Sequence, residues 1–228
     1  DRLRRRVEAA GQRGIYVSVM LFQGFSVEQK GTRGVDPNKG NAWDGHPYNA
    51  RNNINGIDAD PKRAGRGIAS HTLEIPTITR IQEAYLRKVV ETVGDLDNIL
   101  YEVTNESGPY SIRWQYHVIR YVKRIEAEAG KLHPVGMTFP YIGGTNAALF
   151  KSPADWISPG PEGGYAAYPP AADGSKVIVN DTDHLWGIGG DHKWVWKSFT
   201  RGMNTLYMDP YDKTLNWSFR WEVDREER

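Results

Sequence analysis

Asn105 and Glu106 follow a short apolar run, residues 100–103, and a helical pattern begins a few residues later. The run has the composition of a buried strand, so an amide and a carboxylate stand where a strand gives way to a helix. A carboxyl group in such a partly apolar setting can be held protonated and can then act as a general acid. Hydrolysis of a glycosidic bond needs two carboxyl groups: one protonates the leaving oxygen, and the other attacks the anomeric carbon or activates water.

Asp181 and Asp183 are the candidates for the second carboxylate. They follow the apolar run 176–180, and because Thr182 separates them, both side chains point the same way in an extended chain. Asp181 is favoured because it stands directly at the predicted strand end. Aromatic side chains near these acids can stack on sugar rings. The residues predicted to contact a sugar are Asn105, His184, Trp186, Trp43, His46, Tyr141 and Asp209.

Each candidate also has a structural interpretation. Glu106 stands before a helical pattern, and a carboxylate is favourable at a helix N-terminus. Asp181 and Asp183 can bind loop amides through their side chains. His46 can order the long loop in which it lies, and His184 fits a structural role as well.

Short apolar runs alternate with helical patterns along the whole chain. This alternation predicts βαβ units and a parallel sheet. The predicted strands are residues 14–22, 98–104, 134–139, 154–158, 176–180 and 203–209. Between the first two, residues 23–77 are rich in Gly, Asn, Asp and Pro, and a loop of that length is usually functional.

A closed (β/α)8 barrel and a doubly wound sheet both fit this alternation. The doubly wound nucleotide-binding fold needs a GxGxxG turn after an early strand, and "GGTN" and "GIGGDH" do not have that spacing. Polar side chains gather instead at the carboxyl ends of several predicted strands, where barrel enzymes keep their sites. We therefore predict a TIM barrel of the α/β class. The polar strand ends are Gln23, Asn105–Glu106, Tyr141, Asp181–Asp183 and Asp209.

The predicted barrel is incomplete. Six strands are predicted where a full barrel has eight, so residues 1–228 are interpreted as a single partial catalytic domain that holds the third to eighth strands. The chain begins inside an amphipathic helical pattern, which suggests that upstream sequence, including any export signal, is missing. A missing export signal would be consistent with a secreted protein or with a periplasmic protein of a bacterium. An open barrel exposes strand edges, and a homo-oligomer would cover them.

Composition narrows the range of partners. The 29 basic and 28 acidic residues nearly balance, so nucleic acid is not the expected partner. The chain has no cysteine and no apolar run of the length that a membrane span needs. We predict a carbohydrate substrate and no cofactor.

The segment "YEVTNESG" resembles the fourth strand of the clan-A retaining glycoside hydrolases, a (β/α)8 superfamily that includes many cellulases and mannanases. This resemblance implies that Glu106 is the acid/base, that Asn105 lies near the sugar 2-hydroxyl, and that a nucleophile ends the seventh strand. "KVIVND" occupies that place. The chain also resembles cellulase-like families that carry "HPYNARNNINGI" after the third strand and "DTDHLWG" after the seventh. It departs from the clan in offering Asp181 where the nucleophile is a Glu, so the carboxylate spacing can be retaining or inverting.

Two other functions fit the sequence. Asp181, Asp183, His184, Asp191 and His192 are ligand types that suit Zn²⁺ or Mn²⁺ in a metal-dependent hydrolase, although no HxH or HExxH pair is present. A sugar-binding remnant without catalysis fits the incomplete barrel.

Overall fold

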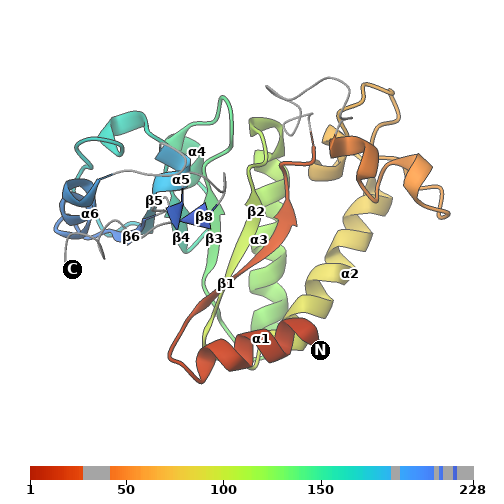
Figure 1. Ribbon diagram of the computed structural model, residues 1–228. Coiled ribbons are helices and arrows are strands. Elements are labelled where there is room, and N and C mark those ends of the chain that lie inside the picture. The colour runs from red at the N-terminus through yellow and green to blue at the C-terminus, as the bar shows by residue number, and fades with distance from the viewer. Residues whose placement is uncertain (28–41, 186–190, 208–210, 213–217, 220–228) are drawn as a thin grey trace. The chain divides into compact units, whose positions relative to one another are not determined.

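The computed structural model describes residues 1–27, 42–185, 191–207, 211–212 and 218–219 (Figure 1). Two compact units make up the chain. Unit 1 comprises Asp1–Gly144 with Ser152–Ala154, and unit 2 comprises Thr145–Lys151 with Asp155–Arg228. Each unit is described by itself. No helix of the described residues is both long and apolar enough to cross a membrane.

Unit 1 alternates helices with parallel strands, as the sequence predicts. Its elements are α1 (Arg2–Gly11), β1 (Val17–Gln23), α2 (Pro76–Val93), β2 (Ile99–Asn105), α3 (Ile112–Glu128) and β3 (Val135–Thr138). Strand β2 lies between β1 and β3 and is parallel to both. The β1–β2 register pairs Val17 with Ile99 and Gln23 with Asn105, so both strands end at the same level.

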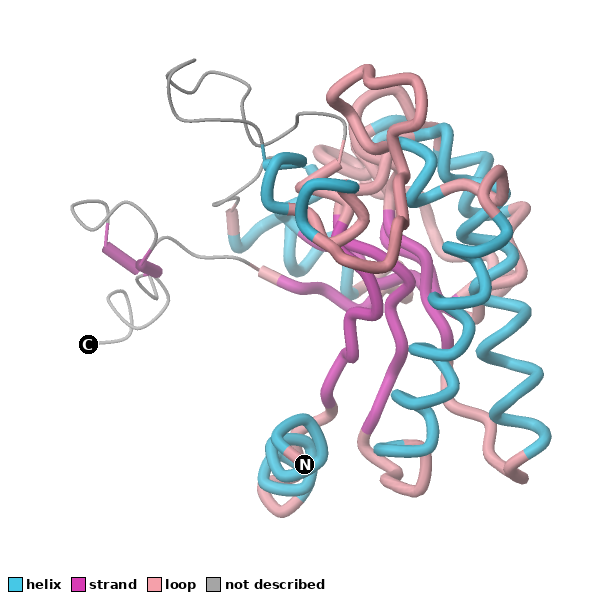
Figure 2. Tube along the Cα trace, turned by 90° about the vertical axis from the view of Figure 1, so that its right-hand side faces the viewer, coloured by secondary structure: helices cyan, strands magenta, loops and turns pink. Residues whose placement is uncertain are grey.

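Helices α2 and α3 run side by side along one face of β1 and β2 (Figures 1 and 2). Val19 and Leu21 of β1 are buried, and so are Tyr101 and Val103 of β2. By contrast, Met20 on the other face of β1 is 44% exposed. The continuous apolar run predicts burial on both faces, but β1 alternates buried and exposed side chains.

In its described residues 42–75, the predicted long loop between β1 and α2 contains three short 3-10 turns. They are η3 (Ala42–Gly45), η4 (Ala50–Asn52) and η5 (Ile68–His71). Helix α2 then begins at Pro76, in the first turn, where the missing N–H of proline leaves no hydrogen bond unmade. A further turn, η6 (Pro109–Ser111), connects the end of β2 to α3.

Unit 2 also contains three parallel strands in chain order, with β5 between β4 and β6. Its elements are α4 (Asn146–Phe150), β4 (Trp156–Ser158), η7 (Glu162–Gly164), β5 (Val177–Asp181), α5 (Thr182–Leu185), α6 (His192–Phe199), β6 (Asn204–Leu206), β7 (Tyr211–Asp212) and β8 (Ser218–Phe219). Asp191 is the N-cap of α6, as its position directly before the helical pattern 192–201 predicts: its side chain accepts a hydrogen bond from the Trp194 N–H at 2.7 Å. The antiparallel pair β7–β8 and the single turn α5 are not predicted by the sequence pattern.

The structure confirms an α/β protein whose six predicted strands all exist and are parallel to their neighbours within each unit. The closed or partial barrel remains a prediction.

A buried carboxylate joins α3 to the amino ends of the strands in unit 1. Glu126 is 1% exposed, and it accepts hydrogen bonds from the Tyr101 hydroxyl at 2.9 Å and from the His133 backbone N–H at 2.9 Å. The His133 ring also lies 2.7 Å from the same Glu126 oxygen. Burial and the nearby Glu126 raise the pKa of the Tyr101 hydroxyl well above its usual range, so the hydroxyl stays a donor. This network fixes the end of α3 against β2.

We expect Tyr101→Phe to lower the free energy of unfolding by about 1–3 kcal/mol, because a buried Glu126 oxygen loses its donor. Urea denaturation measures the change. Tyr16→Phe is the matched control: Tyr16 is 68% exposed, and its change should stay within about 0.5 kcal/mol. Equal stabilities of the two variants would contradict the role given to this network.

Candidate functional site

The carboxyl ends of β1 and β2 carry the polar side chains that the sequence predicts there. The Asn105 amide donates a hydrogen bond to the Gln23 side-chain oxygen at 3.1 Å, and the same oxygen accepts from the Phe25 N–H at 2.7 Å. The backbone continues this pairing, because the Gly24 N–H donates to the Asn105 carbonyl at 2.7 Å. Asn105 is therefore held in place on the end of the strand beside Glu106.

Glu106 adopts a left-handed backbone conformation, with φ of +48°. For a residue with a side chain this conformation costs about 1–2 kcal/mol relative to the right-handed one. Such a conformation persists only where the surroundings determine it, and it occurs preferentially at functional sites. Side chains alternate between the two faces of β2, and the turn at Glu106 ends this alternation. The direction of the half-buried Glu106 carboxylate is therefore set by the turn and not by the strand.

Gly24 makes the close approach of the two strand ends feasible. A Cβ atom on Gly24 would lie 2.5 Å from the Ser107 backbone nitrogen and 2.6 Å from the Asn105 carbonyl oxygen. Both atoms belong to the backbone, so they could not rotate away. Glycine at this position is therefore required by the turn that carries Glu106.

The predicted sugar-binding residues Trp43 and His46 lie together in the loop after β1. Trp43 is 2% exposed and packs with Ala59 and Ile78 in a small core. The His46 ring lies against it, with centroids 4.8 Å apart. His46 Nδ1 accepts a hydrogen bond from the Tyr48 N–H at 3.1 Å, which requires the unprotonated nitrogen. Burial lowers the pKa of His46 from 6.5 to about 4.

In unit 2, Asp181 is the last residue of β5, and Asp183 and His184 lie in the following turn α5. The Asp181 carboxylate accepts a hydrogen bond from the Asp183 N–H at 2.9 Å. Burial raises the pKa of Asp181, and the charge of nearby His184 opposes that rise. Ser158 at the end of β4 holds His184, because its hydroxyl lies 2.8 Å from His184 Nδ1. The neighbouring strand ends therefore bring Asp181, His184 and Ser158 into one cluster.

The remaining predicted site residues are placed as follows. Tyr141 follows β3, is 40% exposed, and donates its backbone N–H to the Ser107 carbonyl at 3.1 Å. Trp186 and Asp209 lie outside the described residues. The structure thus groups Gln23, Asn105 and Glu106 within unit 1, and Asp181, Asp183 and His184 within unit 2.

Sequence reasoning did not identify several residues that support these groups. Ser158 ends a predicted strand, so its position could have indicated it. Ser107 and His71 share a hydrogen bond at 2.9 Å across 36 positions of the chain, and no spacing rule connects them. Gly24 follows Gln23 directly, but its closeness to Ser107 depends on the register of β1 against β2.

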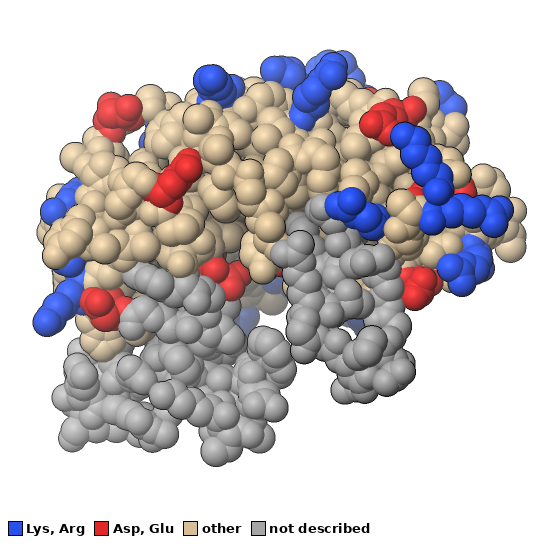
Figure 3. Space-filling view, turned by 90° about the horizontal axis from the view of Figure 1, so that it is seen from above, with Lys and Arg blue, Asp and Glu red and all other residues tan. Residues whose placement is uncertain are grey.

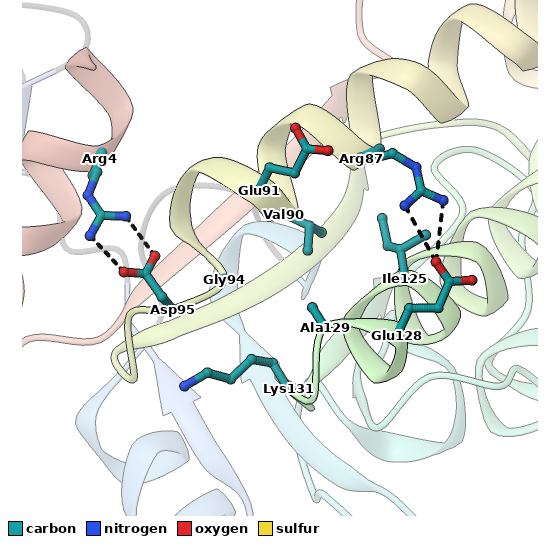
Figure 4. Close-up of a pocket in the computed structure, with 10 residues that line it drawn as sticks. All are labelled: Arg4, Arg87, Val90, Glu91, Gly94, Asp95, Ile125, Glu128, Ala129 and Lys131. Atoms are coloured by element: carbon teal, nitrogen blue, oxygen red, sulfur yellow. Dashed lines mark hydrogen bonds and ion pairs between the residues drawn. The ribbon is translucent and has the colours of Figure 1, made fainter.

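A pocket of about 500 Å³ lies at the other end of unit 1, between α1 and the C-terminal ends of α2 and α3 (Figure 4). Val90 and Ile125 line it, and Arg4 pairs with Asp95 across its edge at 2.6 Å. Arg87 likewise pairs with Glu128 at 3.4 Å. These charges neutralise one another, so the pocket shows no unbalanced charge for a ligand.

Figure 3 shows the molecule from above, relative to the orientation of Figure 1, with its charged side chains coloured. Basic and acidic side chains are both present on this face, and neither sign covers it continuously. Among the described residues, this distribution agrees with the balanced composition.

The residues of the alternative metal site have other contacts. Asp191 caps α6, and the His192 ring lies edge-on to Tyr207 with centroids 5.6 Å apart. Among residues 1–27, 42–185 and 191–207, no three His, Asp or Glu side chains form a group that could hold a metal ion.

Comparisons of the chain with protein-family models, with curated proteins and with solved structures find no match.

The lowered pKa of His46 predicts a pH dependence of stability. The unfolded chain binds a proton at His46 near pH 6.5, whereas the folded protein binds it only near pH 4. The unfolded state therefore binds more protons between these values, and stability falls as the pH falls, by at most about 1.4 kcal/mol per pH unit. His46→Gln cannot titrate, so its free energy of unfolding should decline less over this range. Identical slopes for parent and variant would contradict the burial of His46.

Proposed function

We propose that the protein is a glycoside hydrolase that cleaves β-glycosidic bonds in a plant-type polysaccharide or oligosaccharide. Glu106 serves as acid/base, and Asp181 serves as the second carboxylate. The observation that carries the proposal is the placement of Asn105 and Glu106 at the carboxyl end of a parallel strand, with Glu106 in a left-handed conformation. That placement supports the resemblance of "YEVTNESG" to the fourth strand of clan-A glycoside hydrolases. In this proposal, β1–β6 are the third to eighth strands of a (β/α)8 barrel.

The two proposed carboxyl groups have different surroundings, as two different roles require. Glu106 follows an amide that is hydrogen-bonded to Gln23, and an amide beside the acid can bind a sugar hydroxyl. Burial raises the pKa of Asp181, and His184 beside it opposes that rise. An ionised carboxylate is the form that attacks carbon.

The reaction proceeds in two steps. In the first, a carboxylate oxygen of Asp181 forms a bond to the anomeric carbon, the glycosidic C–O bond breaks, and the Glu106 carboxyl gives its proton to the leaving oxygen. In the second, Glu106 takes a proton from water, the water oxygen bonds to the anomeric carbon, and the bond to Asp181 breaks. Both carboxyl groups then return to their starting states.

We expect Glu106→Gln to lower the turnover of a β-linked polysaccharide by about 10²–10⁴-fold, because the amide cannot donate the proton. A dinitrophenyl glycoside needs little acid assistance, so its cleavage to the glycosyl-enzyme should fall much less. The measurement is kcat/KM on the polymer and on aryl β-glucosides, β-cellobiosides and β-mannobiosides. Glu91→Gln on the exposed surface of α2 is the matched control and should behave as the parent. A Glu106→Gln variant as active as the parent on the polymer would disprove the role.

The choice between Asp181 and Asp183 is tested by the two Asn variants. We expect Asp181→Asn to abolish most turnover, and Asp183→Asn to lower it by less than about 10-fold, because Asp181 stands at the strand end. The anomer released first, followed by NMR, gives the stereochemistry. Retention is expected for a nucleophilic Asp181, and inversion would assign it instead to activation of water. Loss of activity in Asp183→Asn alone would exchange the roles of the two residues.

A further inference from the structure

The turn at Glu106 needs a support that the strand itself does not supply. A left-handed glutamate sits between Asn105, whose carbonyl is bound by the Gly24 N–H, and Ser107, whose backbone lies directly against Gly24. The residue after Glu106 therefore decides whether the turn keeps its geometry. Ser107 is 1% exposed, and its own carbonyl is held by the Tyr141 N–H.

The Ser107 hydroxyl has two partners inside the protein. It lies 2.8 Å from the Thr104 hydroxyl, on the strand side of the turn, and 2.9 Å from His71 Nδ1 in η5. Thr104 and Ser107 flank the pair Asn105–Glu106, so their contact closes the turn around the candidate acid. His71 anchors this closed turn to a separate segment of the chain.

His71 is itself fixed in position. It is 2% exposed, and its ring stacks on Trp114 of α3 with centroids 4.4 Å apart and planes 13° apart. The Trp114 indole N–H donates to Gln82 at 2.8 Å, and the Gln82 amide donates to the Ser70 carbonyl at 2.6 Å. Ser70 precedes His71, so these contacts form a closed circuit through η5, α2 and α3. A buried network with such connections is rigid.

We propose that Ser107 and His71 are positioning residues for Glu106: their hydrogen bond keeps the turn in the conformation that directs the Glu106 carboxyl to the glycosidic oxygen. This inference rests on the proposed function. Neither residue touches the substrate in this role. A general acid acts only within hydrogen-bond reach of its target, and a displacement of about 1 Å can cost about 10²-fold in rate.

The dependence of rate on the leaving group tests the inference, because it separates acid positioning from folding. In Ser107→Ala, we expect kcat/KM for an unsubstituted phenyl glycoside to fall by about 10–100-fold and that for a dinitrophenyl glycoside by less than about 3-fold. His71→Phe keeps an aromatic ring that can stack on Trp114 but loses the ring nitrogen. We expect it to lower kcat/KM for the phenyl and the dinitrophenyl glycoside by the same factors as Ser107→Ala. His71→Asn keeps a hydrogen-bonding group near the place of Nδ1 and should recover part of the phenyl glycoside activity.

Ser111→Ala is the matched control. Ser111 is also fully buried, and its hydroxyl bonds the Gly108 carbonyl at 2.6 Å and accepts from Gln115 at 2.8 Å. Loss of the Ser111 hydroxyl should destabilise the fold and should therefore lower the activities on the phenyl and the dinitrophenyl glycoside equally. If Ser107→Ala and His71→Phe also lower both glycosides equally, the positioning role is overturned.

If the proposed function is wrong, the parent protein cleaves none of the aryl glycosides, and this result is distinct from a failure of the positioning role. The inference is decided in that case by crystal structures of the parent and Ser107→Ala. We expect Glu106 to leave the left-handed conformation, or its carboxyl to move by about 1 Å or more, when the hydroxyl is removed. An unchanged Glu106 in Ser107→Ala would overturn the inference.

Discussion

The hydrogen bond from the Gly24 N–H to the Asn105 carbonyl, at 2.7 Å, is the contact on which the candidate site of unit 1 depends. It extends the parallel pairing of β1 and β2 by one residue and brings the two strand ends as close as backbone atoms allow. No side chain fits at Gly24, since its Cβ would lie 2.5 Å from the Ser107 nitrogen. The chain must therefore leave β2 by another path, and it does so through a left-handed Glu106.

Unit 1 combines this strained turn with rigid supports at both ends of its strands. At the amino ends, Tyr101 and His133 satisfy the buried carboxylate of Glu126. At the carboxyl ends, the buried contact of His71 with Ser107 supports the turn. Functional groups are positioned accurately when their supporting shell is locked by packing and hydrogen bonds, and loops alone do not achieve this. The contacts of Ser70 and His71 with α2, α3 and Ser107 fix η5 near Glu106.

The sequence predicts the elements of this protein better than the contacts between them. Apolar runs and helical periodicity indicate all six parallel strands, and Asp191 is recognisable as an N-cap because capping is a local interaction. The strand-end position of Asn105 and Glu106 follows from the same local pattern. The burial of Trp43 against Ile78 is not visible in the sequence, because this contact joins two distant segments of the chain. The contact of Ser107 with His71 and the left-handed Glu106 depend on strand register and on chain segments far apart, which no periodicity encodes.

Asp181 illustrates how the environment of a carboxyl group limits its chemistry. Burial raises its pKa and so opposes the ionised form that a nucleophile or a general base needs. The charge of His184 and the hydrogen bond from the Asp183 N–H act in the opposite direction. Ser158 on the neighbouring strand holds His184 beside the acid, with its hydroxyl 2.8 Å from His184 Nδ1. Burial is the larger of these influences, so the pKa of Asp181 stays above its ordinary value. The proposed nucleophilic role therefore depends on the contacts with His184 and with the Asp183 N–H, which work against burial, and Asp181 has these contacts in addition to its place at the end of β5.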